Sequence, residues 1–407
     1  MHDVAVVGGG LTGVMMATAL SYAGVDVALV DRDGDQPPKA DERTTTINAA
    51  GARMLTALGV WDRLPVAPTP IHRIAIAEGA PPTGLAARRR ARSDLSWQTA
   101  DTPMAFVAGN MALQAALRDS IASRPVTQIP GVAVSDWHMH PDGAEMALST
   151  ADGASSSLRA RLIVACDGAR SRLAEGAGLR CRETRQTQTA IVTLLEAERH
   201  HDNTAFQRFL QTGPFALMPF GGNRLSLVWT LPNAEAERLL AIDEIAFEAA
   251  CLDAFGPGLG YLRLVAPRLA WPLRPSWRHR ITAPGLILAG DAAHAIHPLA
   301  GQGYNLALAD AAVLADLLVH TSRRGLPASH MSLRHAYDTA RWRERAAMTT
   351  ATSGLNSLFS RGPKGLRHLA GLGFAMLDRL PVKSVISDIA AGGQLAEAAL
   401  LDGRLPS

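Results

Sequence analysis

Three glycine-containing segments carry residue types suited to binding a nucleotide. The first has the pattern GxGxxG, with Gly8, Gly10 and Gly13 at the fixed positions. Gly8 permits a tight turn, Gly10 lets a pyrophosphate approach the backbone, and Gly13 allows a helix to pack closely on a strand. Asp31 follows roughly 20 residues later, where an acid can bind a ribose hydroxyl. The segment predicts a dinucleotide site, with a plain glycine turn as the alternative, and does not separate FAD from NAD.

The second segment lies late in the chain. An apolar run over residues 286–289 ends in Gly290 and Asp291, and a loop with further glycines leads into a helix. The carboxylate can accept hydrogen bonds from the hydroxyls of an extended polyol. The helix N-terminus stabilises negative charge on an electron-poor ring. Helix capping by Asp291 is the simpler alternative.

The third segment, Asp167-Gly168, follows an apolar run over residues 162–166 and precedes Arg170 and Arg172. A turn closed by a salt bridge explains these residues as well as a ligand site does. Both interpretations stay open at this point.

The elements around these segments predict an α/β protein. A strand over residues 3–7, a helix over 12–23 and a strand over 26–30 form a βαβ unit, which implies a parallel sheet with helices on its faces. A change of pattern from residue 181 to 275 predicts antiparallel strands in a second domain. We expect a discontinuous first domain over residues 1–70, 104–180 and 276–330, a second domain over 71–103 and 181–275, and a C-terminal helical region over 331–407.

Composition excludes several classes of protein. A formal net charge of +3 is too small to indicate a nucleic-acid partner. Three cysteines in no paired spacing argue against a disulfide framework or a metal site, and fit a reducing, cytoplasmic compartment. The uncharged stretch over residues 4–25 is long enough for a membrane span. Its glycine cluster, however, favours a strand, a loop and a helix.

Together, and in this order, the three segments resemble those of the single-component FAD-dependent aromatic hydroxylases. The loop over residues 297–303, with Asn305 and Asp310 after it, is similar to the signature of the ubiquinone-biosynthesis branch, and so is the run over 213–219. The resemblance covers nearly the whole chain. Two departures are mild: Ala307 stands where the branch usually has Gly, and Asp31 where Glu is common.

The resemblance implies a Rossmann-like FAD-binding domain, a substrate domain with a mixed or antiparallel sheet, and C-terminal helices. Asp291 would bind the ribitol chain, and residues 301–305 would lie beside the isoalloxazine ring. Asp167 and Gly168 are linked in the family to both FAD and the nicotinamide donor. The implied FAD contacts are Gly8, Gly10, Gly13, Asp31, Arg43, Gln114, Asp167, Gly168, Gly290, Asp291, Pro298, Gly301, Gly303 and Asn305.

The implied reaction is hydroxylation of a polyprenylated phenol or quinone precursor by O2 through a flavin hydroperoxide, with NAD(P)H as the electron donor. The cofactor carries this chemistry, so neither a catalytic triad nor a metal is required. The sequence identifies no catalytic base, and we interpret His294 and His297 as structural. Apolar residues suggest a substrate pocket in the second domain, although an ordinary sheet core explains them almost as well: Phe215, Leu217, Met218 and Phe220.

Several alternatives remain. The protein could hydroxylate a small soluble aromatic, reduce prenyl chains, or serve as a non-catalytic flavoprotein subunit. Arg43 could form a surface ion pair, and Gln114 could face water. The apolar and basic stretch over residues 366–380 could rest on the inner membrane surface, near other ubiquinone-biosynthesis proteins. Packing of this stretch on the FAD-binding domain is the alternative.

Overall fold

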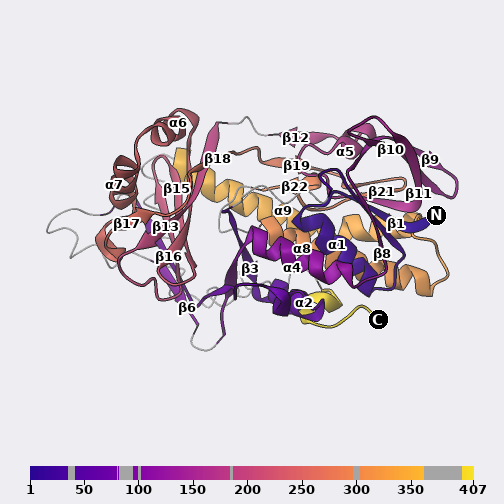
Figure 1. Ribbon diagram of the computed structural model, residues 1–407, viewed down its shortest axis with the longest axis horizontal. Helices are drawn as coiled ribbons and strands as arrows, with labels where there is room; N and C mark the ends of the chain where they lie inside the picture. Colours follow the sequence, from indigo (N-terminus) through magenta and orange to yellow (C-terminus); the bar gives the residue numbers. More distant parts are fainter. Residues whose placement is uncertain are drawn as a thin grey trace.

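The computed structural model describes residues 1–34, 42–79, 81, 95–99, 102–183, 187–296, 303–361 and 397–407. Figure 1 shows two sheet-based parts side by side. One part contains the N-terminal strand and the helices α1, α4 and α8, and the other contains a second sheet beside α6 and α7. The long helix α9 extends from the first part toward the second (Figure 1).

The first sheet has the strand order β20-β21-β11-β1-β2-β8, with β10 and β9 added beside β11. The pairs β1–β11, β1–β2, β11–β21 and β2–β8 are parallel. The carboxyl ends of β1, β11 and β21 therefore lie next to one another, and ligands bind at this edge in open α/β sheets. The strands are β1 His2–Val7, β2 Val27–Asp31, β8 Val126–Pro130, β9 Val132–His140, β10 Gly143–Thr150, β11 Ser155–Ala165, β20 Thr282–Ala283 and β21 Leu286–Leu288.

Helices cover this sheet, which explains why its central strands are apolar along their length. α1 packs against both α4 and α8, and α8 packs against α9. A 3-10 turn near the C-terminus, η6, packs against α2. The helices of this part are α1 Leu11–Tyr22, α2 Ala49–Ala57, α4 Asn110–Ala122, α5 Arg172–Gly176, α8 Gly303–Arg323 and α9 Met331–Arg361, and η6 spans Ala399–Asp402.

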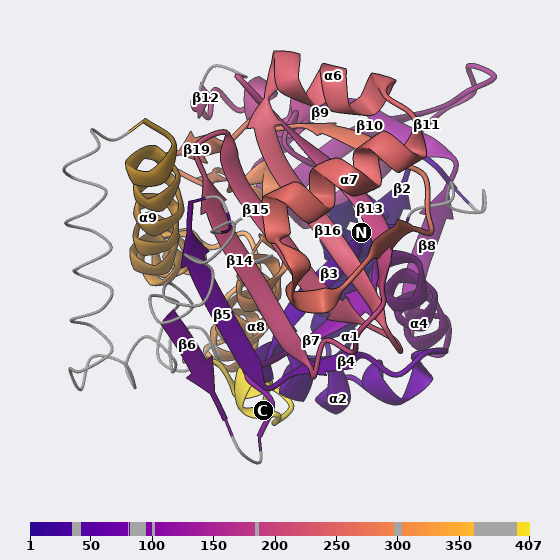
Figure 2. The same cartoon turned by 90° about the vertical axis from the view of Figure 1, so that its left-hand side faces the viewer.

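The second sheet has the order β17-β13-β16-β15-β14-β5-β6, with β18 paired to β13. It is antiparallel except that β5 lies parallel to β14. Figure 2 shows α6 and α7 in front of this sheet. The elements are β5 Arg73–Glu78, β6 Leu95–Gln98, β13 Gln188–Ala197, β14 Thr204–Leu210, β15 Gly213–Phe220, β16 Arg224–Pro232, α6 Asn233–Ala241, α7 Glu244–Phe255, β17 Leu262–Leu264 and β18 Leu269–Pro272.

Two small sheets complete the fold. One has the order β3-β7-β4, and the other β12-β19-β22. Their strands are β3 Thr44–Asn48, β4 Thr69–Ile71, β7 Ala105–Gly109, β12 Cys181–Glu183, β19 Ser276–Arg278 and β22 His294–Ala295. The predicted α/β fold class is confirmed. The domain boundaries stay a prediction.

The helices of the described part of the chain include none that is long and apolar enough to cross a lipid bilayer. The uncharged stretch at the N-terminus is divided between β1, the glycine turn and α1, as its glycines predict. The stretch over residues 366–380, a candidate for membrane contact, lies outside the described residues.

Candidate functional site

The GxGxxG segment forms the turn between β1 and α1. Gly8 has a φ of +117°, and a Cβ there would overlap the carbonyl oxygen of Cys166. A Cβ on Gly13 would overlap the carbonyl oxygen of Gly8. Gly10 differs, because its φ is −74° and a Cβ there would meet nothing within 4 Å. Open space therefore lies before the N-terminus of α1, where backbone amides can bind phosphate.

Gly9 is required for a different reason. A Cβ at Gly9 would overlap the carboxylate of Asp31, which stands at the end of β2 and is only 7% exposed. The Asp33 amide donates to Asp31 Oδ1 at 3.1 Å. The predicted ribose-binding acid is thus held directly against the glycine turn, and the run of three glycines is the sequence signal for this close approach.

Helix α4 places two side chains over the same turn. Gln114 Nε2 donates to the Gly9 carbonyl oxygen at 3.5 Å, and Arg118 Nη2 donates to it at 3.2 Å. Arg118 Nη2 also lies 2.8 Å from Asp31 Oδ2. Gln114 therefore contacts the turn, and its role in binding FAD stays a prediction. The sequence alone does not single out Arg118, whose only signal is its position one helical turn after Gln114.

The late Gly-Asp turn lies against helix α1. Gly290 has a φ of +59°, and a Cβ there would come within 2.7 Å of Thr12 Cγ2 on α1. The neighbouring Asp291 is an exposed residue, although other protein atoms lie close to its carboxyl. Burial raises the pKa of this carboxyl, and the nearby charges of His294 and Arg43 partly offset the rise. Two distant segments of the chain thus meet at one place.

The Asp-Gly segment after β11 completes the group. The Cys166 amide donates to the Val7 carbonyl at 2.8 Å, which joins the ends of β11 and β1. Asp167 Oδ1 is buried and has no hydrogen-bond partner within the described structure. Burial raises the pKa of the Asp167 carboxyl, and a hydrogen bond from Ser171 opposes the rise. A buried acceptor without a partner suits a site that receives a polar ligand.

Asn305 joins helix α8 to the small sheet β3-β7-β4, and Arg43 directly precedes β3. The Arg43 guanidinium carbon lies 4.2 Å from the centroid of the Trp271 ring, within the range of a cation–π contact. Asn305, at the start of α8, accepts from the Asn48 amide at 2.9 Å and donates to the Thr46 carbonyl at 3.0 Å. Its side chain therefore joins α8 to β3. Of the other predicted residues, Gly303 begins α8, and Pro298 and Gly301 lie outside the described residues.

A buried carboxylate holds the Gly-Asp turn in place. Asp310 on α8 is fully buried and accepts from the Gly290 amide at 2.8 Å, from Arg341 Nε at 2.7 Å and from His294 Nε2 at 2.9 Å. Burial alone would raise the pKa of Asp310, but His294 and Arg341 together hold it well below its usual range. The structural interpretation of His294 agrees with this contact, and His297 lies outside the described residues.

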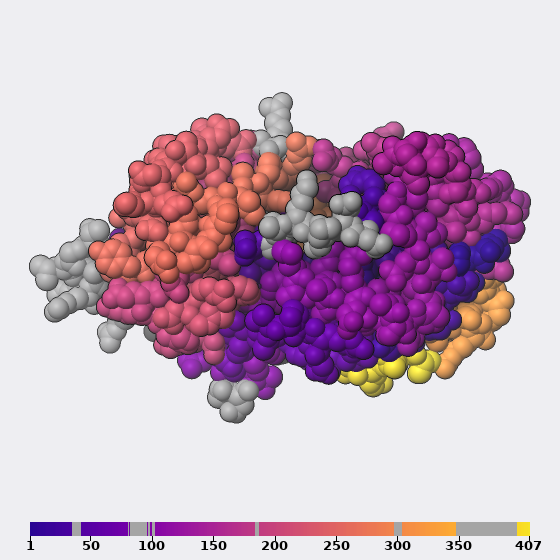
Figure 3. All heavy atoms as spheres, viewed as in Figure 1, coloured from indigo at the N-terminus to yellow at the C-terminus, as the bar shows by residue number. Residues whose placement is uncertain are grey.

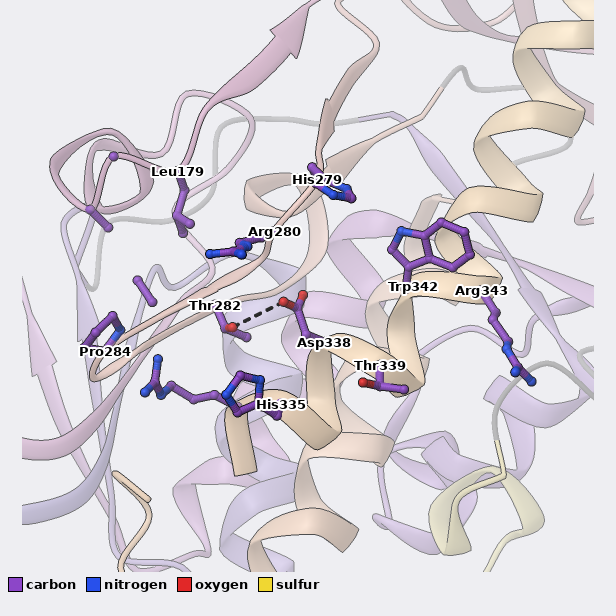
Figure 4. A pocket seen from close by; sticks show the side chains of 14 residues that line it. Leu179, His279, Arg280, Thr282, Pro284, His335, Asp338, Thr339, Trp342 and Arg343 are labelled. Atoms are coloured by element: carbon purple, nitrogen blue, oxygen red, sulfur yellow. Dashed lines mark hydrogen bonds between the residues drawn. The ribbon is translucent and has the colours of Figure 1, made fainter. Parts of the chain in front are cut away.

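A separate hollow of about 700 Å³ lies between residues 279–284 and α9 (Figure 4). In the described chain, its lining includes none of the residues predicted to bind FAD. Asp338, in the middle of the hollow, accepts from the Ile281 amide at 3.3 Å and from the Thr282 hydroxyl at 3.5 Å, and so ties α9 to the strand β20. The hollow is therefore distinct from the glycine turns, which carry the cofactor assignment.

The comparisons with known proteins agree with this geometry. A family model described as FAD binding domain matches residues 1–351. A protein called ubiquinone hydroxylase UbiL, from Rhodospirillum rubrum, is 36% identical over 395 residues, covering 96% of this chain and 89% of that protein. The 3-demethoxyubiquinol 3-hydroxylase of Escherichia coli is 28% identical, with 93% and 95% covered. The structure of p-nitrophenol 4-monooxygenase PnpA from Pseudomonas putida DLL-E4 matches with a TM-score of 0.76 at 19% identity, over 97% of this chain and 99% of that one.

The fold and the turns define a flavoprotein with a dinucleotide-binding edge. The chain belongs to the FAD-binding domain family. The predicted FAD cofactor and the class of FAD-dependent monooxygenase are confirmed, and that class implies O2 and an NAD(P)H-type donor. The open space at Gly10 and the unpartnered oxygen of Asp167 fit such a cofactor.

Replacing Gly10 by Ala tests where the cofactor lies. The added methyl group meets no protein atom within 4 Å and the φ of −74° suits Ala, so we expect the free energy of unfolding of the apoprotein to stay within about 0.5 kcal/mol. The same methyl group would stand where a pyrophosphate approaches the backbone. We expect the Kd for FAD, measured by quenching of flavin fluorescence, to rise at least about tenfold, a cost of about 1.4 kcal/mol.

Gly258→Ala is the matched control, because the Cβ added at Gly258 also meets only ordinary contacts, at 3.8 Å, in a turn after α7. Gly258→Ala should change neither the free energy of unfolding nor the Kd for FAD. Unaltered FAD affinity in Gly10→Ala would contradict the placement of the cofactor at this turn.

Replacing Asp310 by Asn tests the buried carboxylate. The variant removes one of the two carboxylates that pair with the buried Arg341 and leaves only Glu344, so we expect the free energy of unfolding at pH 7 to fall by about 3 kcal/mol. The folded-state pKa of Asp310 is depressed, so its contribution is present above the unfolded value of about 3.9 and is lost as pH falls through the folded value. The difference in free energy of unfolding between wild type and variant, measured by urea unfolding, should therefore become smaller below about pH 4. The exposed pair of Asp142 with Arg159 gives the control, since Asp142→Asn should change stability little. Equal effects of the two substitutions would refute the central role of Asp310.

Proposed function

We propose that this protein hydroxylates the aromatic ring of a polyprenylated phenol in ubiquinone biosynthesis, using FAD, O2 and an NAD(P)H-type donor. The observation that carries the proposal is the meeting of the Gly8 turn, the Asp167 turn and the Gly290 turn at adjacent strand ends. The identity of 36% to a protein named as a ubiquinone hydroxylase, over 96% of this chain, supports the choice of substrate.

We assign the residues at these turns to FAD. The Gly8–Gly13 turn and Asp31 would hold the ADP half, with Gln114 and Arg118 above the turn. Asp291 would accept hydrogen bonds from hydroxyls of the ribitol chain, because it is an exposed residue next to Gly290, which lies against Thr12 of α1. The remaining assignments are Arg43, Asp167, Gly168, Gly290, Pro298, Gly301, Gly303 and Asn305. NAD(P)H would approach near Asp167 and Gly168.

FAD, when bound, supplies the activation of O2, and the protein supplies the position of the ring and the exclusion of water. The second sheet has two different faces. Phe215 and Leu217 point to the core beneath α6 and α7, so the pocket interpretation is wrong for them. Met218 packs on the opposite face, and Phe220 beside it, against the strands β4 and β7. This second face is apolar and turned toward the FAD-binding part, and we assign the substrate ring to it.

The activity test uses the FAD-loaded protein, NAD(P)H, ¹⁸O2 and a phenol carrying a prenyl chain. We expect a product with one added ¹⁸O atom and NAD(P)H oxidation stimulated by the phenol. The same phenol without its chain is the comparison. Faster turnover of the unprenylated phenol would favour the alternative of a small soluble substrate. Hydrogen peroxide as the sole product from every phenol would reject ring hydroxylation.

We also propose that the protein works at the cytoplasmic surface of the inner membrane, where a prenylated substrate dissolves, alongside other ubiquinone-biosynthesis proteins. A sequence pI near 9.0 permits attraction to anionic lipid. In a flotation experiment we expect the protein to rise with vesicles containing anionic lipid at low salt, and less so at high salt because the attraction is screened. Protein that stays at the bottom with both anionic and neutral vesicles would remove this proposal.

A further inference from the structure

Gln207, in the middle of β14, is a buried amide on the apolar face of the second sheet. It has two register partners: Ala216 on the neighbouring strand β15 and Ile76 on β5, on the other side of β14. Directly opposite residues of paired strands project to the same face. Ala216 belongs to the cluster that packs toward β4 and β7, and so does Ala205, two residues before Gln207 on the same strand. The side chain of Gln207 therefore lies on the face turned toward the FAD-binding part.

The amide nitrogen of this side chain lacks a partner. Gln207 is only 8% exposed, and its Nε2 is buried without a hydrogen bond to any described residue. Leaving a buried donor unsatisfied is unfavourable, and an apolar residue of similar size would avoid the cost. Ser226, a polar residue on the same face, is by contrast engaged, because it accepts from the Thr44 hydroxyl at 2.7 Å. An unsatisfied donor in this position indicates a ligand that brings an acceptor.

We infer that Gln207 is a substrate-binding residue whose amide donates to an oxygen on the aromatic ring of the substrate, a phenolic or quinone oxygen. This inference rests on the proposed function. A ring that is apolar except for its oxygen substituents matches a face that is apolar except for a few amide and hydroxyl groups. The hydrogen bond would fix the rotation of the ring in its plane, and with it the carbon atom presented to the flavin.

Gln207→Leu tests the inference because Leu keeps most of the volume and removes the donor. The measurement is the Kd, from changes in the flavin absorption spectrum, of two prenylated aromatics that differ only in one ring hydroxyl. We expect wild type to prefer the hydroxylated compound by roughly tenfold or more, and Gln207→Leu to lose this preference. FAD affinity should be unchanged, and thermal stability should be equal to or above that of wild type, because an unsatisfied donor has been removed.

Gln128→Leu, on the exposed strand β8 of the first sheet, is the matched control and should keep the preference. If Gln207→Leu still discriminates between the two compounds, or if it is destabilised as a structural hydrogen bond would require, the inference is wrong. If wild type binds neither compound, the proposed substrate fails instead, and the two failures are thereby distinguished.

Discussion

The arrangement of the cofactor edge depends on the buried carboxylate of Asp310. A fully buried carboxylate is stable only when it is paired and hydrogen-bonded; here Arg341 supplies the opposite charge, and the Gly290 amide and His294 Nε2 are further hydrogen-bond partners. These partners come from the end of β21, from β22 and from α9. One charge on α8 thereby fixes the position of the Gly-Asp turn relative to two helices.

The second constraint is the close approach of backbone to backbone at the strand ends. Gly8 lies against Cys166, Gly13 lies against Gly8, and Gly290 lies against Thr12. Contacts of this kind leave no room for a side chain, so glycine stands at each of these positions. This is why the turns could be predicted from the sequence: each depends on a local pattern of strand, glycine and helix.

The residues that could not be predicted depend on contacts between distant segments. Arg118 reaches Asp31 across 87 positions of the chain, and no local pattern signals that ion pair. The pairing of β5 with β14 is likewise a long-range, parallel contact; the residue pattern predicts antiparallel strands here, and the family resemblance implies a mixed or antiparallel sheet. The alternation of Phe215 and Leu217 with Ala216 and Met218 was visible in the sequence. The sequence does not indicate which of the two faces is covered by α6 and α7, because both faces are apolar.

The glycine turns and the second sheet differ in how they can determine which ligand binds. Half of the residues that we propose to contact the dinucleotide are glycines, and few of these positions could be substituted without loss of the ligand. The second sheet is different. Its face toward β4 and β7 consists of side chains on regular strands, and each side chain can be substituted without altering the backbone. Selection among aromatic substrates is therefore expected to depend on that face. The few polar groups on it would have the largest effect, since a mismatched buried hydrogen bond costs more than a mismatched methyl group.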